Sequence, residues 1–123
     1  MKKYGFTLVE IMITLAIIGI IVMIAIPSWM KQREGARSVS CQENLTKIDG
    51  AKEQYSFENN VADKDPLNDI ELADLCGANN FLKMVPECPA QGEYVLQPIG
   101  TPPTCSYEVP EGFKPHSIGE VVD

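Results

Sequence analysis

Few side chains in this 123-residue chain could do chemistry, and the main candidates are four cysteines and one histidine. The cysteines are Cys41, Cys76, Cys88 and Cys105, and no two of them form the Cys-x-x-Cys spacing that is typical of zinc sites. His116 lies in a segment without periodicity, where we expect a solvated or capping side chain. A Cys/His nucleophile pair therefore has no support. We expect no catalytic residue, no metal, no cofactor and no enzymatic activity.

Glu10 is a further candidate, because it is the only ionised side chain between residues 6 and 30. A carboxylate in an apolar run costs about 2.5 to 3.5 kcal/mol near the membrane centre, and less at the membrane edge. This cost predicts a compensating partner, and hence a role in assembly rather than in catalysis. The alternative is that Glu10 reaches the lipid head groups near the helix start, where the helix dipole also favours a negative charge.

The element that must position Glu10 is an apolar helix over residues 6–30. About 24 helical residues span roughly 36 Å, which is enough to cross a bilayer core. Lys2 and Lys3 favour a cytoplasmic N-terminus, although basic residues just beyond the apolar run weaken this rule. The sequence therefore predicts a single-pass membrane anchor with the C-terminal part outside.

The helix is expected to continue beyond the membrane. Pro27 ends the apolar run and predicts a kink rather than a break. Apolar residues then recur at helical spacing over residues 41–55, with charged residues around the rest of the circumference. The helix should therefore reach about residue 58, before Asn59 and Asn60 stop it.

The remaining residues predict a small head with short elements. Asp65, followed by proline, is typical of a helix start, and it predicts a short helix to about Cys76. A second helical turn is expected over residues 80–84. Two runs rich in β-forming residues, 93–97 and 103–107, predict a hairpin. The expected fold class is therefore α+β.

The charge of the chain excludes one class of partner. The net charge is -7, and residues 31–123 hold 8 Lys and Arg against 16 Asp and Glu. Nucleic-acid binding requires clustered basic residues along the phosphates. We therefore expect no nucleic-acid partner.

The first ten residues contain a processing pattern. A secretory signal peptide would place small residues after its apolar core, whereas Gly5 precedes the core here. The order Lys-Lys-Tyr-Gly-Phe-Thr-Leu-Val-Glu over residues 2–10 closely resembles the prepilin peptidase site of type IV pilins and type II secretion pseudopilins. In that family the peptidase cuts on the cytoplasmic side after the glycine and methylates the new N-terminus. The resemblance implies cleavage between Gly5 and Phe6, with N-methylation of Phe6.

The same resemblance implies a partner for Glu10. After cleavage, Phe6 and Glu10 would stand four residues apart on one helix face. In pilins this glutamate is thought to pair with the N-terminal amine of a neighbouring subunit as the filament grows. The implied organisation is a leader peptide (1–5), a transmembrane and filament-core helix (6–30), and a periplasmic or extracellular head (31–123).

The implied function is that of a structural subunit of a pilus-like filament, stored in the bacterial inner membrane before assembly. Its partners would be the prepilin peptidase/methyltransferase, like or related subunits, an inner-membrane assembly platform and the lipid bilayer. The small head and short hairpin favour a type II secretion pseudopilin. A major or minor pilin of a type IV pilus is the alternative, as is a bitopic membrane protein that binds a partner without assembling.

Four cysteines in so small a head indicate an oxidising compartment, because disulfides offset the weakness of a small core. Three pairings are possible. Cys88 leads into the first expected strand and Cys105 lies in the second, so we expect a bridge between them. Cys41 and Cys76 would then pair with each other. The pattern around Cys88 and Cys105 is similar to the C-terminal part of some short prepilin-like proteins.

Overall fold

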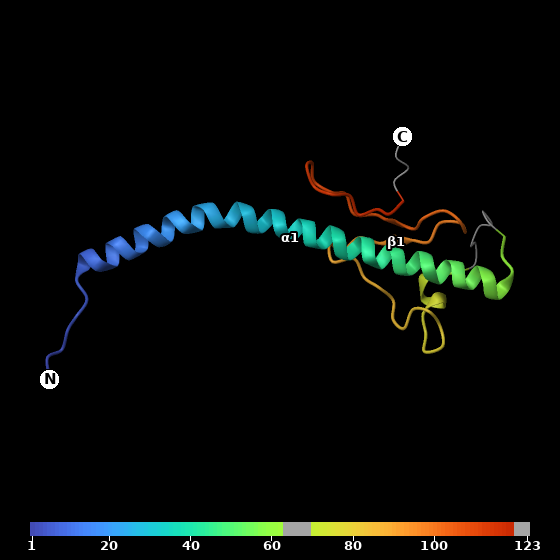
Figure 1. The fold of residues 1–123 in the computed structure, drawn as a ribbon, viewed down its shortest axis with the longest axis horizontal. Helices are drawn as coiled ribbons and strands as arrows, with labels where there is room; N and C mark the ends of the chain where they lie inside the picture. Colours follow the sequence, from blue (N-terminus) through green and yellow to red (C-terminus); the bar gives the residue numbers. More distant parts are fainter. Residues whose placement is uncertain (63–69, 120–123) are drawn as a thin grey trace. The chain divides into compact units, whose positions relative to one another are not determined.

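The computed structural model describes residues 1–62 and 70–119 (Figure 1). Its elements are helix α1 (Leu8–Asn59), the 3-10 helix η1 (Leu72–Leu75), and strands β1 (Tyr94–Val95) and β2 (Thr104–Cys105). The chain divides into two compact units, Met1–Arg33 and Glu34–Asp123, and we call the second unit the head. The predicted α+β class, with a long N-terminal helix and a hairpin in the head, is confirmed.

Helix α1 continues through Pro27 without interruption and ends at Asn59. Asn60 has a φ of 54°, the left-handed conformation that commonly follows the last residue of a helix. The predicted extent of the helix and its stop at these two asparagines are confirmed. The kink at Pro27 stays a prediction.

The part of α1 in the first unit, residues 8–33, is the apolar half. Every large apolar side chain from Leu8 to Met30 is exposed, with exposed fractions between 44% and 78%. Among the described residues, α1 is the one helix long and apolar enough to cross a membrane. The first unit therefore leaves its own apolar surface uncovered.

The part of α1 in the head, residues 34–59, is the domain half, and it buries one face. Ser38, Cys41, Leu45, Ile48 and Lys52 are each at most 1% exposed, and they recur every three or four residues. This spacing places them in one stripe along the helix. The predicted amphipathic continuation is confirmed.

Two small clusters pack on this stripe, and Figure 1 shows the segments after α1 running along the domain half. The apolar cluster connects α1 with η1 and the loop after it through Ile48, Ala51, Leu75 and Leu82. The sulfur cluster connects α1 with the loop before β1 through Cys41, Leu45 and Cys88. The core of the head therefore consists of two small clusters at different positions along one helix.

The short helices of the head differ from expectation. The predicted helix ending at Cys76 begins among residues 63–69, which lie outside the described residues, and only η1 is helical in the remainder. The predicted helical turn over residues 80–84 is wrong. Leu82 instead forms a parallel bridge with Cys76, and the N–H of Gly77 donates to the carbonyl oxygen of Leu82 at 2.8 Å. This bridge occupies backbone groups that a helical turn would need.

The predicted hairpin is confirmed, but its strands are shorter than expected. β1 and β2 pair antiparallel, with Tyr94 opposite Cys105 and Val95 opposite Thr104. Pro103 directly precedes β2 and cannot donate to the ladder, which limits its length at this end. Thr104 also forms an antiparallel bridge with Ser117. The C-terminal segment is therefore held beside the hairpin.

Candidate functional site

Glu10 lies in the first turn of α1, and its carboxylate has a partner within the chain. The N–H of Thr7 donates to Glu10 Oε2 at 2.9 Å, and the N–H of Glu10 donates to Thr7 Oγ1 at 3.3 Å. This reciprocal pair is a capping box, which satisfies two backbone groups at the helix start. Its sequence signature, Thr-x-x-Glu, is present in the chain, and the expectation of a role in assembly alone overlooked it.

The peptide bond between Gly5 and Phe6 lies before α1, in a segment that forms no helix or strand. Phe6 is 88% exposed. No atom beyond the two adjacent residues lies within 4 Å of the position that a Cβ atom would take at Gly5. The fold of the chain therefore does not itself require glycine at this position, and the bond is open to solvent.

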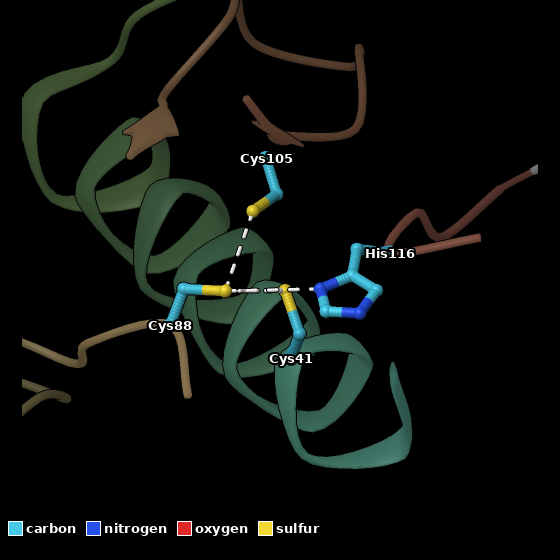
Figure 2. A group of neighbouring side chains, drawn as sticks. All are labelled: Cys41, Cys88, Cys105 and His116. Atoms are coloured by element: carbon cyan, nitrogen blue, oxygen red, sulfur yellow. Dashed lines mark hydrogen bonds between the residues drawn. The ribbon is translucent and has the colours of Figure 1, made fainter. Parts of the chain in front are cut away.

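A second group of reactive side chains lies in the head. The ligand atoms of Cys41, Cys88, Cys105 and His116 all lie within 4.8 Å of one another, and we name these residues the Cys3His group. The Sγ atom of Cys88 is 3.8 Å from Cys41 Sγ, 3.6 Å from Cys105 Sγ and 3.7 Å from His116 Nδ1. Figure 2 shows the four side chains pointing toward one another from four different segments.

Cys88 is positioned by a contact of its neighbour with α1, and Cys105 packs against a glycine. Asn44 Nδ2 donates to the carbonyl oxygen of Glu87 at 3.0 Å, which holds the residue before Cys88 on the helix. A Cβ atom at Gly92 would lie 2.5 Å from the Sγ atom of Cys105. Only glycine therefore lets the backbone pass this close to the sulfur.

The histidine is positioned by a separate set of contacts. Ser38 Oγ and Gln42 Nε2 both donate to the carbonyl oxygen of Pro115, at 3.0 Å and 2.9 Å. The ring of His116 packs against the ring of Tyr107, with 4.7 Å between the centroids. The residue before the histidine is thus fixed on α1, and the imidazole is held beside the thiols.

The Cys3His group is largely buried, and burial shifts its protonation. Burial raises the pKa of the Cys41 thiol to about 12. Burial would also raise the pKa of Cys88, but hydrogen bonds from the backbone N–H groups of Ala90 and Gly92 act against it, and the pKa lies below its ordinary value. Burial lowers the pKa of His116, which keeps its imidazole neutral at neutral pH. Cys88 is therefore the thiol whose thiolate the protein favours.

The expectation that His116 is a solvated or capping residue is wrong, because its side chain is only 3% exposed. Its Nε2 atom is buried and has no hydrogen-bond partner among the described residues. Its Nδ1 atom faces the sulfur of Cys88. Sequence spacing could not have revealed this position, because the histidine reaches the group through the fold of an irregular segment.

The structure holds all four cysteines as free thiols, so the two predicted disulfides stay predictions. Cys88 and Cys105 are neighbours, as the first predicted pair requires. Cys41 lies beside Cys88, whereas Cys76 packs against the apolar cluster and donates from Sγ to the carbonyl oxygen of Leu72 at 3.2 Å. The fold thus separates Cys76 from the other three cysteines.

The N-terminal segment matches a known family model. Residues 1–26 match the model of the prokaryotic N-terminal methylation motif. The chain carries a prepilin-type N-terminus. The match includes Gly5, Phe6 and Glu10 and most of the apolar half. The resemblance to type IV pilins and type II secretion pseudopilins, first noted in residues 2–10, is confirmed.

The relatives of this prepilin-type chain belong to two machines. It is 27% identical over 107 residues to type II secretion system core protein G of Escherichia coli (strain K12), which covers 77% of the chain and 72% of that protein. It is 31% identical over 58 residues to the protein of the same name from Klebsiella pneumoniae, covering 47% of the chain and 41% of that protein. It is 38% identical over 57 residues to type IV major pilin protein PilA of Myxococcus xanthus (strain DK1622), covering 46% of the chain and 26% of that protein.

The similarities cover different shares of the relatives. The matches to the Klebsiella pneumoniae and Myxococcus xanthus proteins cover less than half of the length of those proteins. No solved structure matches the chain significantly. The prepilin-type N-terminus is therefore the part of the chain that a family model matches.

Proposed function

We propose that this chain is a structural subunit of a pilus-like filament, and specifically a type II secretion pseudopilin. The observation that carries the proposal is the coincidence of the methylation motif over residues 1–26 with an apolar half that the chain leaves exposed. Lipid covers this half before assembly, and neighbouring subunits cover it afterwards. The chain is a single-pass inner-membrane protein, with its N-terminus in the cytoplasm and its head in the periplasm.

Processing by the prepilin peptidase is the first step of this function. The peptidase cuts between Gly5 and Phe6 and methylates the amine of Phe6. Two features support this assignment: the bond is exposed, and the fold does not itself need glycine at Gly5. The requirement for glycine then comes from the peptidase rather than from the chain.

Glu10 has two roles in succession. In the uncut chain its carboxylate closes the capping box with Thr7. Cleavage adds a charged amine at Phe6, one helical turn away, and a neighbouring subunit then brings the same pair of groups to the interface. A carboxylate and an amine of two subunits neutralise each other in lipid, which offsets the cost of burying either one.

The test separates these two roles. The full-length chain is expressed with its own assembly machinery as wild type, Glu10→Ala or Thr7→Val, and we measure membrane insertion, the mass of the N-terminal peptide and incorporation into sheared filaments. Each variant removes one of the two hydrogen bonds of the capping box, the hydroxyl acceptor in Thr7→Val and the carboxylate acceptor in Glu10→Ala, but only Glu10→Ala loses the carboxylate. We expect Glu10→Ala alone to abolish incorporation while insertion and cleavage persist. Wild-type incorporation of Glu10→Ala would contradict the proposal, and an intact Met1 in the native host would contradict the processing step.

The type IV pilus is the second candidate, and the similarity to the Myxococcus xanthus major pilin favours it. The two machines differ in phenotype. Deletion of the gene should abolish secretion of folded proteins across the outer membrane if the chain is a pseudopilin. Loss of surface pili with normal secretion would assign the chain to a type IV pilus instead.

A further inference from the structure

The Cys3His group has the ligand set of a structural metal centre. Zn²⁺ in structural sites takes four Cys or His ligands in a tetrahedron, with Zn–S bonds of about 2.3 Å. Two sulfur ligands of such a site lie about 3.8 Å apart, and a sulfur and a nitrogen slightly closer. The observed separations from Cys88 Sγ are 3.8 Å, 3.6 Å and 3.7 Å. These three distances match edges of a zinc tetrahedron, and the other separations among the four ligand atoms are within 4.8 Å.

We propose that Cys41, Cys88, Cys105 and His116 bind one Zn²⁺ ion that fastens the C-terminal segments of the head to helix α1. The proposal concerns the head alone and does not depend on the filament role of the apolar half. It departs from the expectation that the chain binds no metal, which rested on the absence of a Cys-x-x-Cys spacing. That criterion fails here because each ligand comes from a different segment, and only the fold brings them together.

Backbone N–H groups are directed at the sulfur atoms of Cys88 and Cys105, two of the three proposed sulfur ligands, and metal binds cysteine as the thiolate. The sulfur of Cys88 accepts hydrogen bonds from the backbone N–H groups of Ala90 and Gly92. The sulfur of Cys105 accepts one from the backbone N–H group of Tyr107. Such N–H donors stabilise a negatively charged thiolate more than a neutral thiol.

The surroundings of His116 favour a role as a metal ligand over a role in packing alone. The imidazole of His116 is buried, its Nε2 atom has no hydrogen-bond partner among the described residues, and its Nδ1 atom is the nitrogen that faces the cysteines. The Nδ1 atom faces the thiol group at 3.7 Å, too far for a strong neutral hydrogen bond. A bound cation between Nδ1 and the three sulfur atoms supplies a strong interaction.

A disulfide accounts for the group less completely. A bridge from Cys88 to either Cys41 or Cys105 would leave one thiol buried without a sulfur partner and the histidine unexplained. A mononuclear ion uses all four ligands at once. Ligand atoms within 4.8 Å of one another also leave no room for an iron–sulfur cluster, whose cysteines surround several atoms.

A metal also fits the needs of this head. Its sheet consists of two strands of two residues, and its core is divided into two small clusters. Small domains commonly require disulfides or a metal because they bury too little apolar surface. The Zn²⁺ ion would tie the loop before β1, strand β2 and the segment after Pro115 to one position on α1.

The experiment uses the full-length chain in detergent micelles, and the fourth cysteine provides a matched control. We compare wild type, Cys88→Ser, His116→Phe and Cys76→Ser. After reduction, chelation and dialysis, each is titrated with Zn²⁺ alone and, separately, with Co²⁺, whose absorption reports thiolate ligands and tetrahedral geometry. His116→Phe keeps an aromatic ring against Tyr107 and removes only the nitrogen ligand. Circular dichroism checks that each variant keeps its helix.

We expect wild type and Cys76→Ser to bind one Zn²⁺ per chain and to show the thiolate-to-cobalt absorption. Cys88→Ser and His116→Phe should lose affinity by more than about 100-fold, beyond what changes outside the ligand set cause. Removing Zn²⁺ from wild type should lower the melting temperature of the head. The proposal is overturned if wild type binds no zinc, if Cys76→Ser loses binding as Cys88→Ser does, or if the native chain carries a disulfide within the Cys3His group.

Discussion

The two halves of helix α1 have similar backbone structure and opposite surroundings. The apolar half leaves every large side chain from Leu8 to Met30 exposed, whereas the domain half buries a stripe of residues at every third or fourth position. The difference shows that helix continuity says little about what stabilises each part. The apolar half depends on lipid or on other chains, and the domain half depends on segments of its own chain.

The largest effect should come from separating the halves. All buried residues of both head clusters lie after residue 33, so a chain that begins at Glu34 keeps its core. We expect this shortened chain, prepared with Zn²⁺, to remain soluble without detergent and to melt cooperatively, while the full chain requires detergent. Sedimentation and thermal melting measure the two properties. Aggregation or a non-cooperative melt of the shortened chain would show that the head needs the apolar half.

Two isoleucines on the same helix provide the next comparison. Ile48 is fully buried and Ile17 is 53% exposed. Ile48→Ala should lower the free energy of unfolding of the head by about 2–5 kcal/mol, because it removes buried methyl groups and leaves a cavity. Ile17→Ala should change it by less than about 0.5 kcal/mol. Denaturation in detergent, followed by tyrosine signals of the head, measures both, and equal losses would mean that the halves unfold together.

The sequence predicted the long helix well because its determinants are local. The aliphatic run, the helical spacing of buried residues and the stop at Asn59 and Asn60 can each be read within a few neighbouring positions. The turn predicted over residues 80–84 failed because a bridge between Cys76 and Leu82 outweighs local helix preference. The hairpin was predicted correctly, but its strands were predicted too long, because strand length depends on pairing partners that the sequence does not display.

The two candidate sites also differ in whether their determinants are local in the sequence. The N-terminal motif is a run of neighbouring residues, and the sequence alone identified it. The Cys3His group combines residues up to 75 positions apart, from Cys41 to His116, so no spacing rule reveals it. The buried position of the histidine follows from contacts of Pro115 with α1, which only the folded chain displays.

A smaller effect is expected at a buried charge of the domain half. Lys52 is 1% exposed, and its Nζ atom donates to the carbonyl oxygens of Pro98 and Thr101 at 3.1 Å and 2.6 Å. Lys52→Met leaves both carbonyl groups without this donor and should cost about 1–3 kcal/mol of unfolding free energy. Lys47→Met changes an exposed lysine of the same helix and should be nearly neutral. A neutral result at Lys52 would show that the two hydrogen bonds contribute nothing net.

The pH dependence of this difference has a definite sign. Burial lowers the pKa of Lys52 from its ordinary value of 10.5. The unfolded chain then holds the proton more tightly than the folded chain, so the contribution of Lys52 to stability rises as pH rises through the lowered pKa towards 10.5. The advantage of wild type over Lys52→Met should therefore grow as the pH rises through the lowered pKa towards 10.5. A difference that shrinks with pH would contradict the shift.

The smallest effect should come from two helix glycines that sharpen the comparison between the halves. At Gly35 in the domain half and at Gly19 in the apolar half, no atom other than those of the adjacent residues and of the helix's own backbone lies within 4 Å of the position that an alanine Cβ atom would take. Gly35→Ala should stabilise the head by about 0.5–1 kcal/mol, because alanine loses less backbone entropy in a helix. Gly19→Ala should leave head unfolding unchanged. If Gly19→Ala nevertheless reduces incorporation into filaments, the space at Gly19 is filled by another subunit, since nothing in this chain fills it.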